Sequence, residues 1–145
     1  MTHSPAKIVA EYLQEGSNAL FTGPDGPDWP LFISSLPDEG CPTNAGAVYD
    51  TTGVKKGRMM GDGKNLFTYG VQVKVRASEY DVGWEQASAV ADLLERWHAD
   101  EITIDGSIYL VDSFLQTSSV LSLGKDEQRR VLFAVNGLLM VDQTA

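Results

Sequence analysis

The pattern of apolar and polar positions is most regular in residues 71–97. The stretch VQVKVR alternates, with three valines on one face and polar side chains on the other, which predicts a strand with one buried face. After ASEYD, apolar residues recur every three or four positions, which predicts an amphipathic helix with Asp81 as its N-cap. An alternating strand that ends at Arg76 therefore runs directly into a helix.

One apolar stripe of this helix is expected to lie against the sheet, and small alanines in it would allow close packing. The stripe consists of Trp84, Ala87, Ala91, Leu94 and Trp97 or His98, widened by Val90 and Leu93. The exposed face carries Asp92, Glu95 and Arg96, and Glu85 lies near the positive end of the helix dipole.

The N-terminal part of the chain predicts a short helix followed by short strands. Residues 5–15 form the helix, with Ser4 as its N-cap, Pro5 at its first position and Gly16 as its stop. NALFT, LFISSL and AGAVYDT are strand candidates, and SSVLSLGKDEQ is typical of a turn region.

The C-terminal third indicates β-structure. EITI and SIYLVDSFLQ flank Asp105-Gly106, which is a strong signal for a tight hairpin. The last segment, RRVLFAVNGLLMV, carries apolar residues on both faces. Such a strand is covered on both sides of the sheet, or it is covered by a second subunit.

Residues 52–66, TGVKKGRMMGDGKNL, hold four glycines, four basic residues and two adjacent methionines without periodicity. A phosphate-binding P-loop is excluded, because Asn65 stands where the motif needs Ser or Thr. We interpret the segment as the flexible basic tip of an extended β-hairpin whose flanks are residues 45–51 and 68–76. The two methionines at the tip would be adaptable contact residues.

The 145 residues have the size of one domain, and their net charge of −9 argues against duplex DNA and sequence-specific nucleic acid binding. The charge is unevenly placed: residues 50–76 are mainly basic and residues 79–101 mainly acidic. Segments of opposite sign can pair within one molecule or head to tail between copies. The candidate interface residues are Lys55, Lys56, Arg58, Met59, Met60, Lys64 and Arg76 on the basic side and Glu85, Asp92 and Glu95 on the acidic side.

Polar groups that could converge into a catalytic site are scarce. Cys41 is the only cysteine, and neither His3 nor His98 belongs to a recognisable motif. We therefore expect no catalytic, metal-ligating or cofactor-binding residues and no enzymatic activity. No apolar run approaches the roughly 20 residues that cross a bilayer, so a membrane is not expected among the partners.

Two patterns in the chain resemble the minor capsid and tail-terminator proteins of long-tailed bacteriophages. They are V.V.VRA..YD.G...A..VA.LL in the strand–helix segment and G.DE..R..F..N near the C-terminus. The resemblance covers most of the chain and is weakest over residues 20–44. It implies structural turns at Tyr80 and Asp81 and at Asp126, Glu127 and Arg130.

The resemblance implies an α+β fold, with a mainly antiparallel sheet and helices packed on it, here a long helix, a short N-terminal helix and the extended hairpin arm. It also implies a non-enzymatic virion protein of the tail–neck region that assembles in the host cytoplasm. Such proteins form a ring, typically a hexamer, on the major tail tube protein. The ring stops tube growth and joins the head-completion or connector protein. The alternatives are another neck, head-completion or minor capsid component, or a small-molecule-binding α+β domain.

Arg76 stands where the basic half of the chain meets the acidic half. One interpretation makes this joint the meeting place of two assembly surfaces, with Tyr80 fixing the turn between them. The other is an ion pair of Arg76 with Glu79 or Asp81 within the subunit.

Overall fold

The computed structural model describes residues 2–15, 19–58 and 65–143 and has an α+β architecture. Its helices are α1 (Pro5–Gln14) and α2 (Tyr80–Glu95). Its strands are β1 (Leu31–Ile33), β2 (Ala45–Arg58), β3 (Asn65–Ala77), β4 (His98–Ile104), β5 (Ser107–Gln116), β6 (Leu121–Lys125) and β7 (Val131–Gln143).

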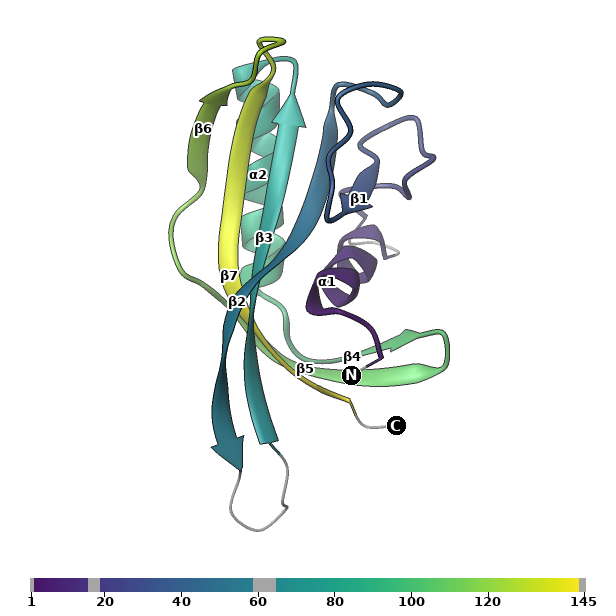
Figure 1. The fold of residues 1–145 in the computed structure, drawn as a ribbon, viewed down its shortest axis with the longest axis vertical. Helices are drawn as coiled ribbons and strands as arrows, with labels where there is room; N and C mark the ends of the chain where they lie inside the picture. The colour runs from purple at the N-terminus through teal and green to yellow at the C-terminus, as the bar shows by residue number, and fades with distance from the viewer. Residues whose placement is uncertain (1, 16–18, 59–64, 144–145) are drawn as a thin grey trace.

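The strands form one curled sheet in the order β1-β2-β3-β7-β5-β4, and β6 pairs with the first part of β7 (Figure 1). β1 runs parallel to β2, whereas the other named pairs are antiparallel, so the sheet is mixed. NALFT contributes only the isolated bridge of Thr22 to Pro30, and LFISSL shrinks to three strand residues. The predicted turn region 118–128 instead contains β6.

Several local predictions are confirmed. α1 begins after Ser4, whose side chain accepts a hydrogen bond from the Lys7 N–H, and Pro5 is its first residue. The Asp50 carboxylate accepts a further bond from the Ala6 N–H at the positive end of this helix. The β4–β5 hairpin turns at Asp105-Gly106, both with positive φ, as a tight turn of this type requires.

The boundaries of α2 differ from the prediction. Its N-cap is Glu79, which makes no side-chain capping bond, and Asp81 lies inside the first turn, where a carboxylate still favours the helix dipole. The helix ends at Glu95, and His98 already begins β4. Trp97 lies between them, stacks on Tyr12 at 4.0 Å between ring centroids, and donates from Nε1 to Asp100. These contacts hold Trp97 out of the helical path and tie α2 to α1.

The buried stripe of α2 begins at Gly83 and not at Trp84, which is 44% exposed. A Cβ on Gly83 would lie 2.7 Å from the Phe133 ring and 3.1 Å from Cβ of Ala77. Only a glycine lets the first turn of the helix approach the sheet this closely, and this approach turns the neighbouring tryptophan outward.

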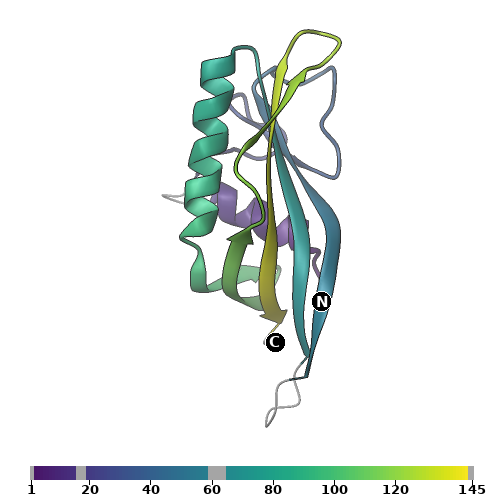
Figure 2. The ribbon, with the colours of Figure 1, turned by 90° about the vertical axis from the view of Figure 1, so that its left-hand side faces the viewer.

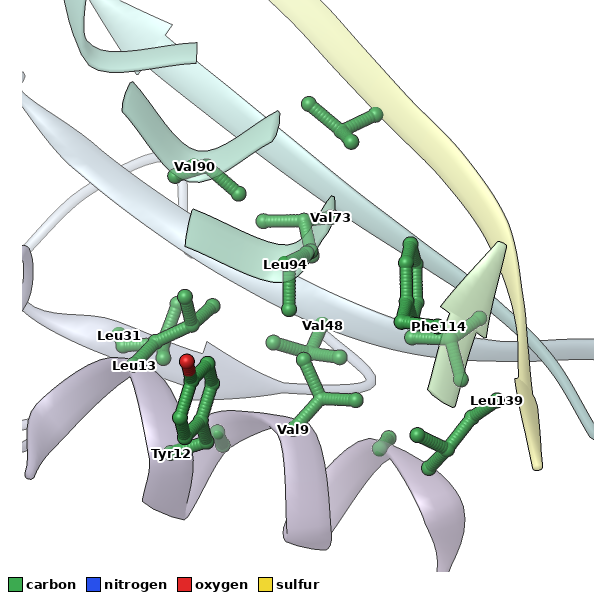
Figure 3. Close-up of a cluster of buried hydrophobic side chains, with 14 of the residues drawn as sticks. Val9, Tyr12, Leu13, Leu31, Val48, Val73, Val90, Leu94, Phe114 and Leu139 are labelled. Carbon is green, nitrogen blue, oxygen red and sulfur yellow. The ribbon is translucent and has the colours of Figure 1, made fainter. Parts of the chain in front are cut away.

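The hydrophobic core lies on the one face of the sheet that both helices cover, which we call the inner face (Figure 2). Side chains from the two helices and six strands meet there, and Figure 3 shows part of the cluster. It includes Val9, Tyr12 and Leu13 of α1, Val90 and Leu94 of α2, and Leu31, Val48, Val73, Phe114 and Leu139 of the sheet.

The opposite, outer face is covered in part by the segment 34–44, which two buried arginines hold in place. Arg76, 1% exposed, donates to the carbonyls of Pro37, Pro42 and Thr43 and to Cys41 Sγ. From the turn that precedes β7, the buried guanidinium of Arg130 donates to the backbone and the carboxylate of Asp38.

The close approach at Gly83 leads to a first prediction. Gly83→Ala should gain about 1 kcal/mol of helix propensity but lose about 1–3 kcal/mol by overpacking against Phe133, so the free energy of unfolding should fall. Urea unfolding measures this free energy. Ser88→Ala, at a half-buried position of the same helix, is the control and should leave stability unchanged or slightly higher. An equal gain in both variants would contradict the close approach.

The arginine contacts lead to a second prediction. Arg76→Met keeps the aliphatic part of the side chain but removes every donor to the segment 34–44. We expect about 3 kcal/mol of lost stability and faster amide exchange in that segment, because hydrogen bonds from a charged group contribute about 1.5–3 kcal/mol. Lys74→Met, two residues away on the same face and half-buried, is the matched control. It should cost less than about 1 kcal/mol, since only the contact with the Tyr49 ring is lost. Equal effects of the two substitutions would refute the role of Arg76.

Candidate functional site

The far end of the β2–β3 hairpin stands out from the rest of the molecule (Figure 1). β7 pairs with β3 only from Thr68 onward, and β1 pairs with β2 only at Gly46–Val48. Beyond these points the hairpin is a ribbon in which residues 54–58 pair with residues 65–68 alone. We call this ribbon the arm. It confirms the predicted hairpin and extends it on both strands.

A bulge at the base of the arm bends β2 between Thr51 and Val54. Gly70 of β3 lies opposite, where a Cβ would come within 2.4 Å of the Thr52 carbonyl oxygen. A glycine is therefore required where the arm leaves the sheet.

The basic residues predicted for the interface lie on or beyond this arm. The backbone of Lys55, Lys56 and Arg58 belongs to β2, so all three are carried on the arm. Met59, Met60 and Lys64 lie outside the described residues.

The acidic residues predicted for the interface lie together on α2. Glu85, Asp92 and Glu95 are exposed, and with the exposed Asp81 their spacing places them along one side of the helix. We call these four the acidic stripe. Within the part of the chain that the structure describes, none of the four forms an ion pair. Among the described residues, the carboxylates of the stripe are therefore without an ion-pair partner.

Arg76 belongs neither to the arm nor to the acidic stripe. Its side chain is buried, so it is not available to another subunit in this conformation. Its partners among the described residues all lie between 37 and 43, and none is a carboxylate, so the ion pair with Glu79 or Asp81 is absent as well. The ion-pair interpretation was therefore wrong, because the guanidinium is bound by segment 34–44. The interpretation of the joint as a meeting place of two assembly surfaces stays a prediction, and the buried Arg76 side chain is not itself exposed at such a surface.

The β6–β7 turn brings two of its predicted residues together. Asp126 accepts from Nε of Arg130 at 2.8 Å and from the Arg130 backbone N–H at 2.9 Å, and the side chain of Arg130 is 9% exposed. Desolvation works to raise the pKa of Asp126, but these hydrogen bonds and the positive charge of Arg130 outweigh it, so the pKa is lowered. Glu127 is exposed in the turn.

Tyr80 packs edge-on against Phe133, at 5.3 Å between ring centroids, and remains 53% exposed. Trp84 makes a similar contact with the same ring at 6.0 Å. Sequence reasoning placed Trp84 in the core and did not recognise an exposed aromatic surface here.

No arrangement for catalysis or metal binding is found in the part of the chain that the structure describes. No group of three or more His, Cys, Asp or Glu residues could hold a metal ion there. A hollow of 330 Å³ beside Trp29 and Asn44 offers Asp28 as its only carboxylate and contains no histidine or cysteine. Among the described helices, none has both the length and the apolar character that a bilayer crossing demands.

Comparison with known proteins bears on the resemblance to phage tail proteins. A search of curated proteins finds no match. The model of a family described as bacteriophage tail terminator protein matches residues 16–141, which is most of the chain, and this confirms the resemblance. The family is structural and not enzymatic, and its members interact with other proteins of the virion tail. The chain therefore belongs to the bacteriophage tail terminator family and has a structural role in a phage tail.

Proposed function

We propose that this protein forms a closed ring, a hexamer, on the last ring of the tail tube. There it stops the growth of the tube and presents the surface that joins the head-completion or connector protein. The family match over residues 16–141 is the observation that carries this proposal. The partners are copies of itself, the major tail tube protein and the connector, and assembly takes place in the host cytoplasm.

A ring needs two unlike surfaces on each subunit, because its contacts are heterologous. The arm and the acidic stripe have the properties of such a pair. The arm carries Lys55, Lys56 and Arg58, and the stripe carries four exposed carboxylates without ion-pair partners among the described residues. The proposed contact places the arm of one subunit against the stripe of its neighbour.

Two physical arguments favour this contact. Among the described residues the arm pairs with no third strand, and an isolated two-stranded ribbon is marginally stable in water, so a partner surface would stabilise it. Subunits with a net charge of −9 also repel one another, and cations placed on the neighbour's carboxylates reduce that repulsion at the point of contact. Met59, Met60 and Lys64, at the end of the arm, are proposed to extend the contact to the neighbour or to the tail tube.

Negative-stain microscopy of assembled tails tests the ring. Tails incubated with the protein should show a ring on the end of the tube that is distal to the tip, and tube elongation should stop. Tails without the protein should lack the ring and continue to elongate. Binding at another place, such as the head side of the neck, would assign the protein to a different neck or head-completion role.

Charge reversal tests the contact between arm and stripe. Lys55→Glu/Lys56→Glu/Arg58→Glu should raise the protein concentration required for assembly about tenfold or more, since three ion pairs of about 0.2–1 kcal/mol are replaced by repulsion. The salt dependence of assembly should weaken as well. Sedimentation velocity at two salt concentrations measures both effects.

A compensating variant and a control make this experiment specific. Adding Glu85→Lys/Asp92→Lys/Glu95→Lys to the reversed arm should restore assembly, because the charges are exchanged and complementary again. Lys7→Glu is the control, since Lys7 lies on α1 and pairs with Glu11 of its own helix. Unchanged assembly of the reversed-arm variant would refute the contact.

A further inference from the structure

Six of the eight exposed large apolar residues in the described part of the chain fall into two groups, and Ile33 and Leu110 lie outside both. Three of them, Tyr80, Val82 and Trp84, lie at the start of α2, and we call them the aromatic ridge. Another three, Leu115, Leu121 and Leu123, lie on β5 and β6, and we call them the leucine strip. Exposed apolar residues grouped in this way are candidates for a contact with another molecule.

The register of the strands places the leucine strip on the outer face of the sheet. Leu115 pairs with Leu138, and Leu121 pairs with Ala134 in the same row as Lys74 of β3. Directly opposed residues point to the same side of a sheet, and Val73 and Val135, which neighbour this row, point to the inner face. Leu115 and Leu121 of the strip therefore lie on the face that neither helix covers, and Leu123 lies in the register shift of β6 beside them.

The strand β6 shows that this part of the outer face lacks a cover. All of its residues, Leu121–Lys125, are exposed, although two of them are leucines 40% and 45% exposed. Its pairing is with β7 alone. The segment 34–44, which covers the outer face beside Arg76, does not bury these leucines.

The aromatic ridge is held in a fixed geometry. Tyr80 and Trp84 both pack edge-on against Phe133, and Phe133 is fully buried. Aromatic side chains that are already ordered lose little entropy on binding, which is why they dominate the energy of many interfaces.

The charges beside the two surfaces are complementary. Glu79, Asp81 and Glu85, all exposed, flank the aromatic ridge. On the outer face, Lys74 of β3 lies in the same row as Leu121. A ridge with acidic flanks would repel a second ridge and attract the leucine strip, which has Lys74 in one of its rows.

The geometry points to a second copy of this chain as the occupant of the leucine strip: we infer that the aromatic ridge of one subunit packs on the leucine strip of the next. This inference rests on the proposed ring and assigns its apolar contact. The ridge belongs to α2 on the inner side, whereas the strip belongs to the outer face. When the ridge of one subunit binds the strip of its neighbour, the first subunit still has its strip and the neighbour still has its ridge, so further subunits can be added in the same way.

The arrangement also agrees with the proposed contact of the arm. The aromatic ridge is at the N-terminal end of α2, near the end of the molecule where β6 meets β7 (Figures 1 and 2). The acidic stripe runs from there toward the end of the molecule from which the arm projects. One neighbour can therefore place its strip on the ridge and its arm on the stripe.

Cysteine cross-linking on tail-bound protein tests the inference. In a Cys41→Ser background, Trp84→Cys and Leu121→Cys are prepared as separate proteins, mixed, bound to assembled tails and oxidised. The mixture should give disulfide-linked dimers, and each protein alone should give none. The chain with both substitutions should give a ladder of oligomers that ends at the size of the ring.

Two leucines of the same strand provide a matched pair of variants. Leu115→Ser, at a position 64% exposed, should weaken ring formation about tenfold, since about 1.4 kcal/mol of apolar contact is lost. Leu110→Ser, at a position 43% exposed, is the control. Leu110 pairs with Asp142, beyond the strip, and its substitution should leave ring formation unchanged.

The outcomes separate this inference from the proposed function. Rings on tails without the mixed cross-link would overturn the inference and leave the ring intact. Cross-linked dimers from a single variant would show a symmetric contact and would overturn it as well, as would cross-linking of Leu121→Cys to the tube protein. Absence of rings from every tail end would overturn the proposed function and this inference together.

Discussion

A sheet has two faces, and in this protein both helices lie on the same one. The inner face is closed by α1 and α2, whose apolar side chains meet those of six strands in one core. The outer face has no helix, so its cover must come from elsewhere. Near Arg76 the cover is the segment 34–44, held mainly by hydrogen bonds to backbone carbonyls, and over β5 and β6 the leucines remain exposed.

The buried arginines follow from this arrangement. A loop without a large apolar anchor can be fixed on a sheet only if its polar backbone groups find partners, and a guanidinium supplies several donors in one plane. Arg76 satisfies three carbonyls between residues 37 and 43, and Arg130 connects the same segment to the β6–β7 turn through Asp38 and Asp126. The two arginines thus serve the fold of the subunit.

Local patterns allowed much of the fold to be predicted from sequence. Ser4-Pro5 marked the start of α1, Asp105-Gly106 marked the turn between β4 and β5, and alternation around Val73 marked the long hairpin. The predictions that failed concerned residues whose positions depend on contacts between distant segments. Gly83 replaces Trp84 on the buried side of α2 because Phe133, fifty residues away, leaves no room for a Cβ.

The same limit applied to the candidate site. The exposure of the acidic residues on α2 followed from helical periodicity, whereas the burial of Arg76 did not follow from its own strand. A signal was nevertheless present. The predicted hairpin pairs Ala45 with Arg76, which places the preceding proline-containing loop beside the arginine. The β6 strand was missed because LSLGK is short and precedes a strong turn signal, so its alternation covers few positions.

The two proposed contacts have different physical roles in assembly. Charged side chains act over about a Debye length, roughly 10 Å at 0.1 M salt, so the arm and the acidic stripe can orient subunits before they touch. Exposed ion pairs contribute little free energy once formed, whereas burial of the aromatic ridge and the leucine strip removes apolar surface from water. Charge would then determine which surfaces meet, and the apolar contact would hold the ring closed. A subunit of this charge can remain dispersed until a tail end brings several copies together, because repulsion acts on the free copies and the apolar surface is buried only in the ring.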